Sequence, residues 1–88
     1  GVPHCGGNPI EHMQYLGPRG VRNRSMGYAR SHREFGLNPF TLARVSDLGD
    51  TPLPRALNPD LTARDIQDFF ERVYQAGIIP VSVGGDSP

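Results

Sequence analysis

Paired cysteines, excess charge and long hydrophobic runs are all missing from this chain of 88 residues. The single cysteine, Cys5, excludes a disulfide within the chain and favours a reducing, cytoplasmic setting. Nine arginines, with no lysine, balance nine acidic residues, and zero net charge disfavours electrostatic binding to nucleic acid or to an anionic membrane. No apolar run is long enough to span a bilayer, and the first residues do not resemble a signal peptide. We therefore expect a cytoplasmic protein with no nucleic-acid or membrane partner.

Glycine and proline, by contrast, are abundant, with 11 and 9 residues. That share predicts long irregular connections, although it stays below the level typical of low-complexity chains. The length allows one small domain with a small core. Several arginines fall in the first half, and without interleaved aromatic residues they favour a solvated helix face over a phosphate-binding patch. They are Arg19, Arg22, Arg24, Arg30 and Arg33.

The clearest predicted element is a helix over residues 63–76. We expect Thr62 to cap its start, with Asp65 three residues further on in a variant of the capping box. Gly77 stands where a left-handed C-terminal cap belongs. One apolar stripe recurs at helical spacing and predicts the buried face, namely Ile66, Phe69, Phe70, Val73 and Tyr74.

A short strand over residues 78–83 follows this helix almost without a linker. It is apolar on both faces apart from Ser82, which is typical of a parallel strand covered by helices on both sides. A second strand is predicted over 41–46, and the crossover between the two is long enough for a right-handed parallel unit. A weaker helix is predicted from Pro18 to about residue 31, where proline suits the first helical turn. The pattern indicates an α/β fold.

Four short blocks follow one another along the chain at spacings that point to a family. They are Gly1-Val2-Pro3, Gly17-Pro18-Arg19 with Val21-Arg22 and Ser25, Asp47-Leu48-Gly49-Asp50, and Val81-Ser82-Val83-Gly84-Gly85-Asp86. Together they resemble the ureohydrolase superfamily, the arginase- and agmatinase-like metallohydrolases, and the agmatinase side more closely. No single block is specific, so the resemblance depends on all four occurring in order over nearly the whole chain.

This resemblance implies that residues 1–88 are the N-terminal portion of a single, incomplete ureohydrolase-like domain. The family fold is a three-layer α/β/α sandwich around a mostly parallel sheet. Its members hydrolyse the guanidino or amidino C–N bond of a small substrate and release urea, using two manganese ions that activate water. They commonly form trimers or hexamers. We expect this portion to be inactive alone, because most of the site would lie beyond residue 88.

The resemblance also assigns roles to individual residues, and some positions depart from the family. A metal-binding histidine follows the family's Gly-Gly-Asp, whereas Ser87 stands here, and a serine hydroxyl is a poor metal ligand. Either this end of the sequence is an artefact, or one metal site is damaged. Asp86 could orient a metal ligand or tie down its own turn. In the family, the block that holds Asp47 and Asp50 is structural.

The opening loop supplies the remaining candidates. By resemblance this loop approaches the mouth of the active site, so His4 and Asn8 are candidates for substrate contact. Cys5 stands where many members have an aspartate, and we expect an ordinary loop thiol. The histidines, His4, His12 and His32, match no compact zinc pattern. We expect no catalytic residue and no certain metal ligand within the chain.

Two other classes of protein stay open at this point. Ser87 motivates a metal-free homologue that keeps the fold and acts as a binding or oligomer-forming subunit. The Gly84-Gly85 turn motivates a nucleotide-binding α/β domain, although it lacks the lysine and the following Ser or Thr of a P-loop.

Overall fold

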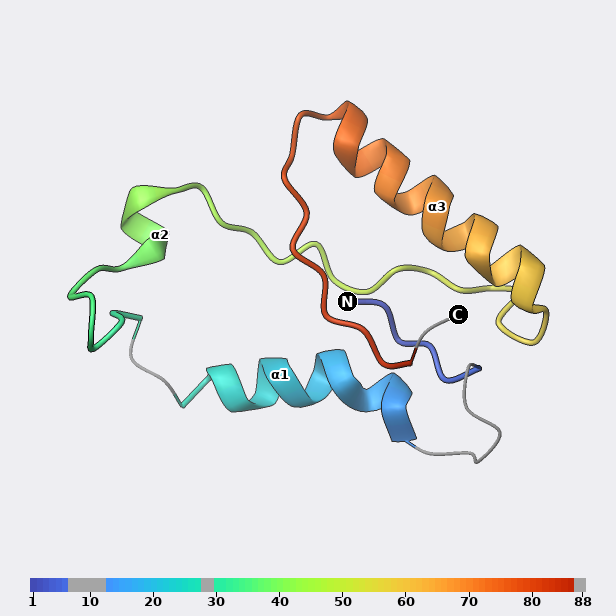
Figure 1. Ribbon diagram of the computed structural model, residues 1–88, viewed down its shortest axis with the longest axis horizontal. Coiled ribbons are helices and arrows are strands. Elements are labelled where there is room, and N and C mark those ends of the chain that lie inside the picture. Colours follow the sequence, from blue (N-terminus) through green and yellow to red (C-terminus); the bar gives the residue numbers. More distant parts are fainter. Residues whose placement is uncertain (7–12, 28–29, 87–88) are drawn as a thin grey trace.

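The computed structural model describes residues 1–6, 13–27 and 30–86, and Figure 1 shows their arrangement. Its helices are a 3-10 helix, η1 (Met13–Leu16), and three α-helices, α1 (Gly17–Ser25), α2 (Pro39–Leu42) and α3 (Pro59–Gln75). The extended segment 78–86 runs from the end of α3 toward α1 and reaches the N-terminal residues (Figure 1). Long extended connections therefore hold much of the described chain, as its glycine and proline content predicts.

Helix α3 is confirmed, but it begins four residues earlier than the sequence pattern predicts. Asn58 is its N-cap, and the Asn58 side chain accepts a hydrogen bond from the Leu61 amide at 3.2 Å. Pro59 occupies the first turn, where its fixed φ and missing N–H suit a helix start. The predicted Thr62 cap is wrong. Thr62 is fully buried within the helix, and its hydroxyl lies 2.9 Å from the carbonyl oxygen of Asn58.

The C-terminal end of α3 has the predicted left-handed glycine. Gly77 has φ +72°, and its amide donates to the Tyr74 carbonyl at 2.9 Å. The Ile78 amide donates to the Val73 carbonyl at 3.3 Å, which completes a Schellman motif. Val73 is the buried hydrophobic residue of the described chain, whereas the predicted core residue Tyr74 is 76% exposed. Tyr74 is exposed because no described segment packs over that side of α3.

One of the two weaker predictions is right in part and the other is wrong. Helix α1 has Pro18 in its first turn as expected, but it ends at Ser25 rather than near residue 31. The predicted strand over 41–46 is wrong, because Thr41 and Leu42 belong to α2 and residues 43–46 form no strand. There the Asn38 side chain accepts from the Phe40 amide at 3.0 Å, so a capped helical turn replaces the strand. Beyond Ala43 the chain is extended.

The predicted parallel pairing of strands 41–46 and 78–83 is absent, because residues 43–46 and 78–83 belong to no strand and the parallel bridge of the described residues joins other segments. Val2 and Gly84 form a parallel bridge, with the Val2 amide donating to the Val83 carbonyl at 2.9 Å. On the other side of the N-terminal segment, the Thr51 amide donates to the Gly1 carbonyl at 2.8 Å. Segment 1–4 therefore lies between segments 49–51 and 83–86. The described residues contain isolated bridges and no longer β-ladder, so they show the start of a parallel arrangement and not a three-layer sandwich.

Candidate functional site

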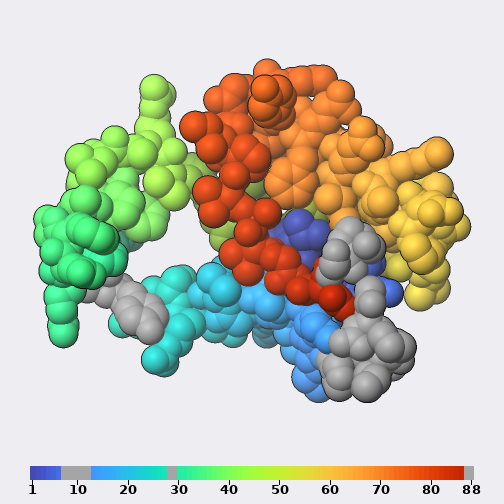
Figure 2. Space-filling model, in the orientation of Figure 1, coloured from blue at the N-terminus to red at the C-terminus, as the bar shows by residue number. Residues whose placement is uncertain are grey.

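The candidate site is the loop 84–86, which lies against the N-terminal segment. The Gly85 amide donates to the Val2 carbonyl at 3.0 Å, and the Asp86 amide donates to the His4 carbonyl at 2.8 Å. Figure 2 shows the end of the red C-terminal segment beside the blue N-terminal residues. Ligand sites of open α/β sheets lie at the carboxyl ends of parallel strands. Loop 84–86 begins at the isolated parallel bridge between Val2 and Gly84, so its position is comparable to such an end.

Close backbone packing explains the glycines around this loop. A Cβ added at Gly85 would lie less than 3.0 Å from the carbonyl oxygens of His4 and Gln14. A Cβ added at Gly17, the first residue of α1, would lie 2.6 Å from the carbonyl oxygen of Gly84. Gly84 itself has open space in the Cβ direction. Gly85 and Gly17 therefore allow the loop to touch both η1 and α1, a packing role that needs no bound phosphate.

His4 is the predicted site residue that the structure places most clearly. It is 5% exposed, and its Nδ1 accepts from the Gly6 amide at 3.4 Å. Its backbone carbonyl holds the Asp86 amide, so the structure brings His4 and Asp86 together. Substrate contact by His4 and a metal-orienting role for Asp86 stay predictions. Asn8 and Ser87 lie outside the described residues.

Arg22 joins α1 to the segment 47–50 through hydrogen bonds to two carboxylates. These partners are not evident from the position of Arg22 in the sequence. Its Nε and Nη2 donate to the two oxygens of the Asp47 carboxylate at 2.7 and 3.0 Å. Its Nη1 donates to Asp50 Oδ1 at 2.6 Å. The Gly49 amide also donates to Asp47, at 2.8 Å, so the Asp47 carboxylate closes its own turn as well. The structural role that the resemblance implies for Asp47 and Asp50 is consistent with these contacts.

The Arg22 network shifts the titration of all three of its members. The hydrogen bonds that the Arg22 guanidinium donates to the Asp47 and Asp50 carboxylates raise its pKa above its usual range. The Arg22 hydrogen bonds, followed by the Gly49 amide, lower the pKa of Asp47 well below its ordinary value. The Arg22 hydrogen bond also lowers the pKa of Asp50. All three groups are therefore charged at neutral pH.

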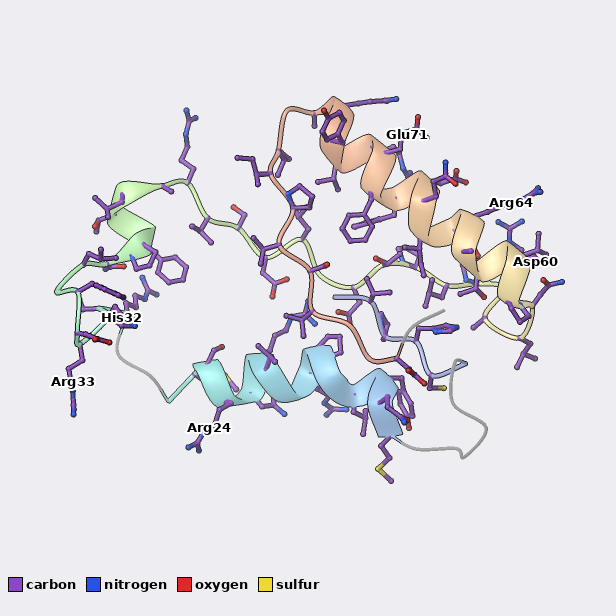
Figure 3. The ribbon with its side chains drawn as sticks, in the orientation of Figure 1. Arg24, His32, Arg33, Asp60, Arg64 and Glu71 are labelled. Carbon is purple, nitrogen blue, oxygen red and sulfur yellow. The ribbon has the colours of Figure 1, made fainter. Side chains whose placement is uncertain are left out.

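The other arginines of the first half do not gather at one place. Arg24 on α1 and Arg33 beyond it point outward from different parts of the molecule (Figure 3). The Arg30 guanidinium lies 5.7 Å from the centre of the Phe40 ring, a cation–π contact within its own segment. This distribution agrees with the predicted solvated face.

Two polar side chains near the site, the buried Thr51 and the half-buried Gln14, carry little signal in the sequence pattern. Thr51 is 2% exposed, and within the described residues neither its Oγ1 nor Oε1 of Gln14 has a hydrogen-bond partner. Both residues reach the site through their backbone. The Thr51 amide holds the Gly1 carbonyl, and the Gln14 carbonyl lies against Gly85. The position of Thr51 just after Asp47-Leu48-Gly49-Asp50 is the one clue that could have found it.

The described residues do not fit a metal ion. Within 1–6, 13–27 and 30–86, no group of three His, Cys, Asp or Glu side chains could hold one. Cys5 is a free thiol of intermediate exposure. Among the same residues, no helix is both long and apolar enough to cross a membrane. What this arrangement can do is hold a backbone loop in place beside a buried imidazole.

Comparison with known proteins identifies relatives along the whole chain. The sequence model of the arginase family matches residues 1–87. A guanidinopropionase of Pseudomonas aeruginosa is 43% identical over 89 residues, which cover 98% of this chain and 27% of that protein. A mitochondrial guanidino acid hydrolase of Homo sapiens is 34% identical, with 98% of this chain and 24% of that protein covered. No solved structure gives a significant match.

A third relative has a different named substrate. A mitochondrial agmatinase of Gallus gallus is 29% identical over 86 residues, which cover 98% of this chain and 25% of that protein. The chain thus spans about a quarter of the length of the curated relatives it matches.

Proposed function

Because this chain belongs to the arginase family, we propose that it is the N-terminal part of a hydrolase that releases urea from a small guanidino compound. The observation that carries the proposal is the match over residues 1–87, together with 43% identity to a guanidinopropionase. The loop 84–86 beside His4 supports it, because this loop begins at a parallel bridge and α/β folds place ligands at the carboxyl ends of parallel strands. The family implies an α/β fold, and we propose that residues 1–88 open its three-layer sandwich.

We propose a guanidino acid as the substrate in preference to agmatine. The two relatives of higher identity named above are a guanidinopropionase and a guanidino acid hydrolase, at 43% and 34%. The agmatinase is 29% identical. A guanidino acid carries a carboxylate where agmatine carries an amine, so the two substrate classes require opposite charges at the far end of the pocket. A pocket for the acid presents a donor or a cation there.

The full-length protein would hold two manganese ions, as the family does. Such a pair activates water and stabilises charge on the group being cleaved. The described part of this chain does not fit a metal ion, so we assign no step of the reaction to its residues. Its contribution is to position the loop 84–86, with Asp86 held at its backbone and His4 beneath it. We expect the 88-residue chain alone to be inactive.

Urea release by the full-length protein tests this function. Purified protein with manganese added is assayed with 3-guanidinopropionate, 4-guanidinobutyrate and agmatine, and the 88-residue chain serves as a control. We expect the full-length protein to hydrolyse at least one guanidino acid faster than agmatine, and the short chain to release nothing. Release of no urea from any guanidino compound would contradict the enzyme proposal, and faster hydrolysis of agmatine would contradict the acid preference alone.

One observation favours a second candidate function. Ser87 stands where the family has a metal-binding histidine, which supports a metal-free homologue that acts as a binding or oligomer-forming subunit. Metal analysis separates the two, because two manganese ions per purified chain exclude the metal-free homologue.

Light scattering of the same sample tests the expected trimer or hexamer. Microscopy of the tagged protein tests the proposed cytoplasmic location, a necessary check because two of the named relatives are mitochondrial.

A further inference from the structure

We propose that Arg22 is a positioning residue that holds the loop 84–86 in place from the opposite end of α1. The proposal deepens the function above and takes from it only the assumption that this loop borders the active site. Arg22 has no contact with the loop in the structure. Its effect passes through a closed ring of contacts that begins and ends on α1.

The first part of the ring is the Arg22 network. Three guanidinium N–H groups bind two carboxylates, Asp47 and Asp50, at 2.6 to 3.0 Å. These contacts attach α1 to the segment 47–50 across 25 and 28 residues of chain. A planar guanidinium can bind one carboxylate with two donors and a second carboxylate with a third. A lysine ammonium is a compact point charge that cannot reproduce this geometry.

The second part of the ring carries the position of segment 47–50 to the N-terminal segment. Thr51 follows Asp50 directly, and the Thr51 amide donates to the Gly1 carbonyl at 2.8 Å. The buried side chain of Thr51, 2% exposed, leaves little freedom for this junction to shift. Whatever fixes Asp50 therefore also fixes the position of Gly1 and Val2.

The third part of the ring closes it on the loop and returns to α1. Val2 bonds to both sides of Gly84, through the Val83 carbonyl at 2.9 Å and the Gly85 amide at 3.0 Å. Gly84 then lies against Gly17, where an added Cβ would be 2.6 Å from the Gly84 carbonyl oxygen. Gly17 and Arg22 are five residues apart on one helix, about 7.5 Å along its axis. Helix α1 thus connects the two contacts as a rigid element: Gly17 contacts the loop, and Arg22 binds segment 47–50.

Hydrogen exchange in the full-length protein tests this ring directly. The variant is Arg22→Gln, which keeps a polar, unbranched side chain and removes the guanidinium with its charge. The matched control is Arg55→Gln, because Arg55 forms an arginine–aspartate pair with Asp65 at the start of α3 and outside the ring. We expect the amides of Val2, Gly85 and Asp86 to exchange about tenfold faster in Arg22→Gln and at the wild-type rate in Arg55→Gln. Arg22→Lys should resemble Arg22→Gln more than the wild type.

Each outcome of the hydrogen-exchange experiment either supports or contradicts the proposal. Unchanged exchange at these three amides in Arg22→Gln would overturn the proposal, and so would an equal increase in Arg55→Gln. If Arg22→Gln does not fold, Asp47→Asn replaces it. Asp47→Asn keeps the 2.6 Å contact between Arg22 and Asp50, so we expect a smaller increase at the same amides, and no increase would again overturn the proposal.

Urea release supplies the second measurement. We expect kcat/KM for a guanidino acid to fall about tenfold in Arg22→Gln and to stay within twofold of wild type in Arg55→Gln. If wild-type protein releases no urea, the proposed function fails, and hydrogen exchange alone then decides whether the ring exists. If wild type is active and Arg22→Gln keeps full activity despite faster exchange, the positioning role is overturned.

Discussion

Helix α3 and the extended segments around loop 84–86 follow the same chain but depend on different kinds of contact. Helix α3 closes both of its ends with residues within a few positions: Asn58 at its start, and Gly77 with Ile78 at its end. The extended segments bond across 50 to 83 residues, as in Thr51 to Gly1 and Gly85 to Val2. Local sequence therefore suffices for α3, whereas the segments around the loop need every partner present.

Gly85→Ala should have the largest effect, because it acts where distant segments meet. Its Cβ would clash with the carbonyl oxygens of His4 and Gln14, which are backbone atoms and cannot turn away. We expect the free energy of unfolding of the full-length protein to fall by about 2–3 kcal/mol, as for an overpacked site. Chemical denaturation measures it. Gly84→Ala, with open space around the added methyl, is the matched control, and an equal loss there would contradict this reading.

Asn58→Ala should have a smaller effect that stays within α3. It removes the hydrogen bond from the Leu61 amide to the Asn58 side chain, and loss of such a cap costs about 1 kcal/mol. Denaturation gives the free energy of unfolding. Hydrogen exchange should be faster in the first turn of α3 and unchanged at Gly85. Faster exchange at Gly85 would mean that the two regions are less independent than their contacts indicate.

Gly77→Ala should cost about as much or slightly less, since a left-handed residue with a Cβ costs about 1 kcal/mol. The φ of +72° and the two bonds that close the Schellman motif require this conformation. Gly20→Ala in α1 is the control with the opposite sign. Gly20 is helical with open space around it, so alanine there should stabilise the protein by a few tenths to about 1 kcal/mol. If both substitutions stabilise the protein, or both destabilise it, this account is wrong.

Of these changes, acid should have the smallest effect on the free energy of unfolding, because the two carboxylates that bind Arg22 are exposed. The pKa values of Asp47 and Asp50 are lowered in the folded state, so their contribution is complete above the unfolded aspartate pKa of about 4. It is lost as pH falls through the lowered folded values. We expect Asp47→Asn to flatten the decline of stability below pH 4. Denaturation of wild type and variant across that range measures this, and parallel curves would contradict it.

Several features were predictable from the sequence, and one sequence pattern was misinterpreted at the starts of two helices. The helix at 59–75 and its left-handed glycine agree with the sequence pattern, whereas the predicted strands over 41–46 and 78–83 are absent. Both errors at element starts come from an Asn-Pro pair. Asn38-Pro39 begins α2 where a strand was expected, and Asn58-Pro59 begins α3 a full turn before Thr62. In each case the asparagine side chain accepts a backbone hydrogen bond and proline fills the first turn.

The candidate site was less accessible to sequence reasoning. His4 was singled out, yet its burial and its backbone contact with Asp86 could not be inferred from spacing. Arg22 was grouped with the arginines of a solvated helix face, and its two carboxylate partners lie 25 and 28 residues away. Thr51 and Gln14 gave no signal, because both act through backbone atoms whose partners no residue type reveals.

The amino-acid order alone was enough for the family, for the position of α3 to within one turn and for the glycine at its end, because caps and helical periodicity act over a few residues. Folding in three dimensions settled which segments flank Val2, why Gly85 tolerates no side chain, and which acids Arg22 binds. These contacts join residues far apart in the chain. Their geometry depends on where each backbone segment is placed, and that information is not present in any local stretch of sequence.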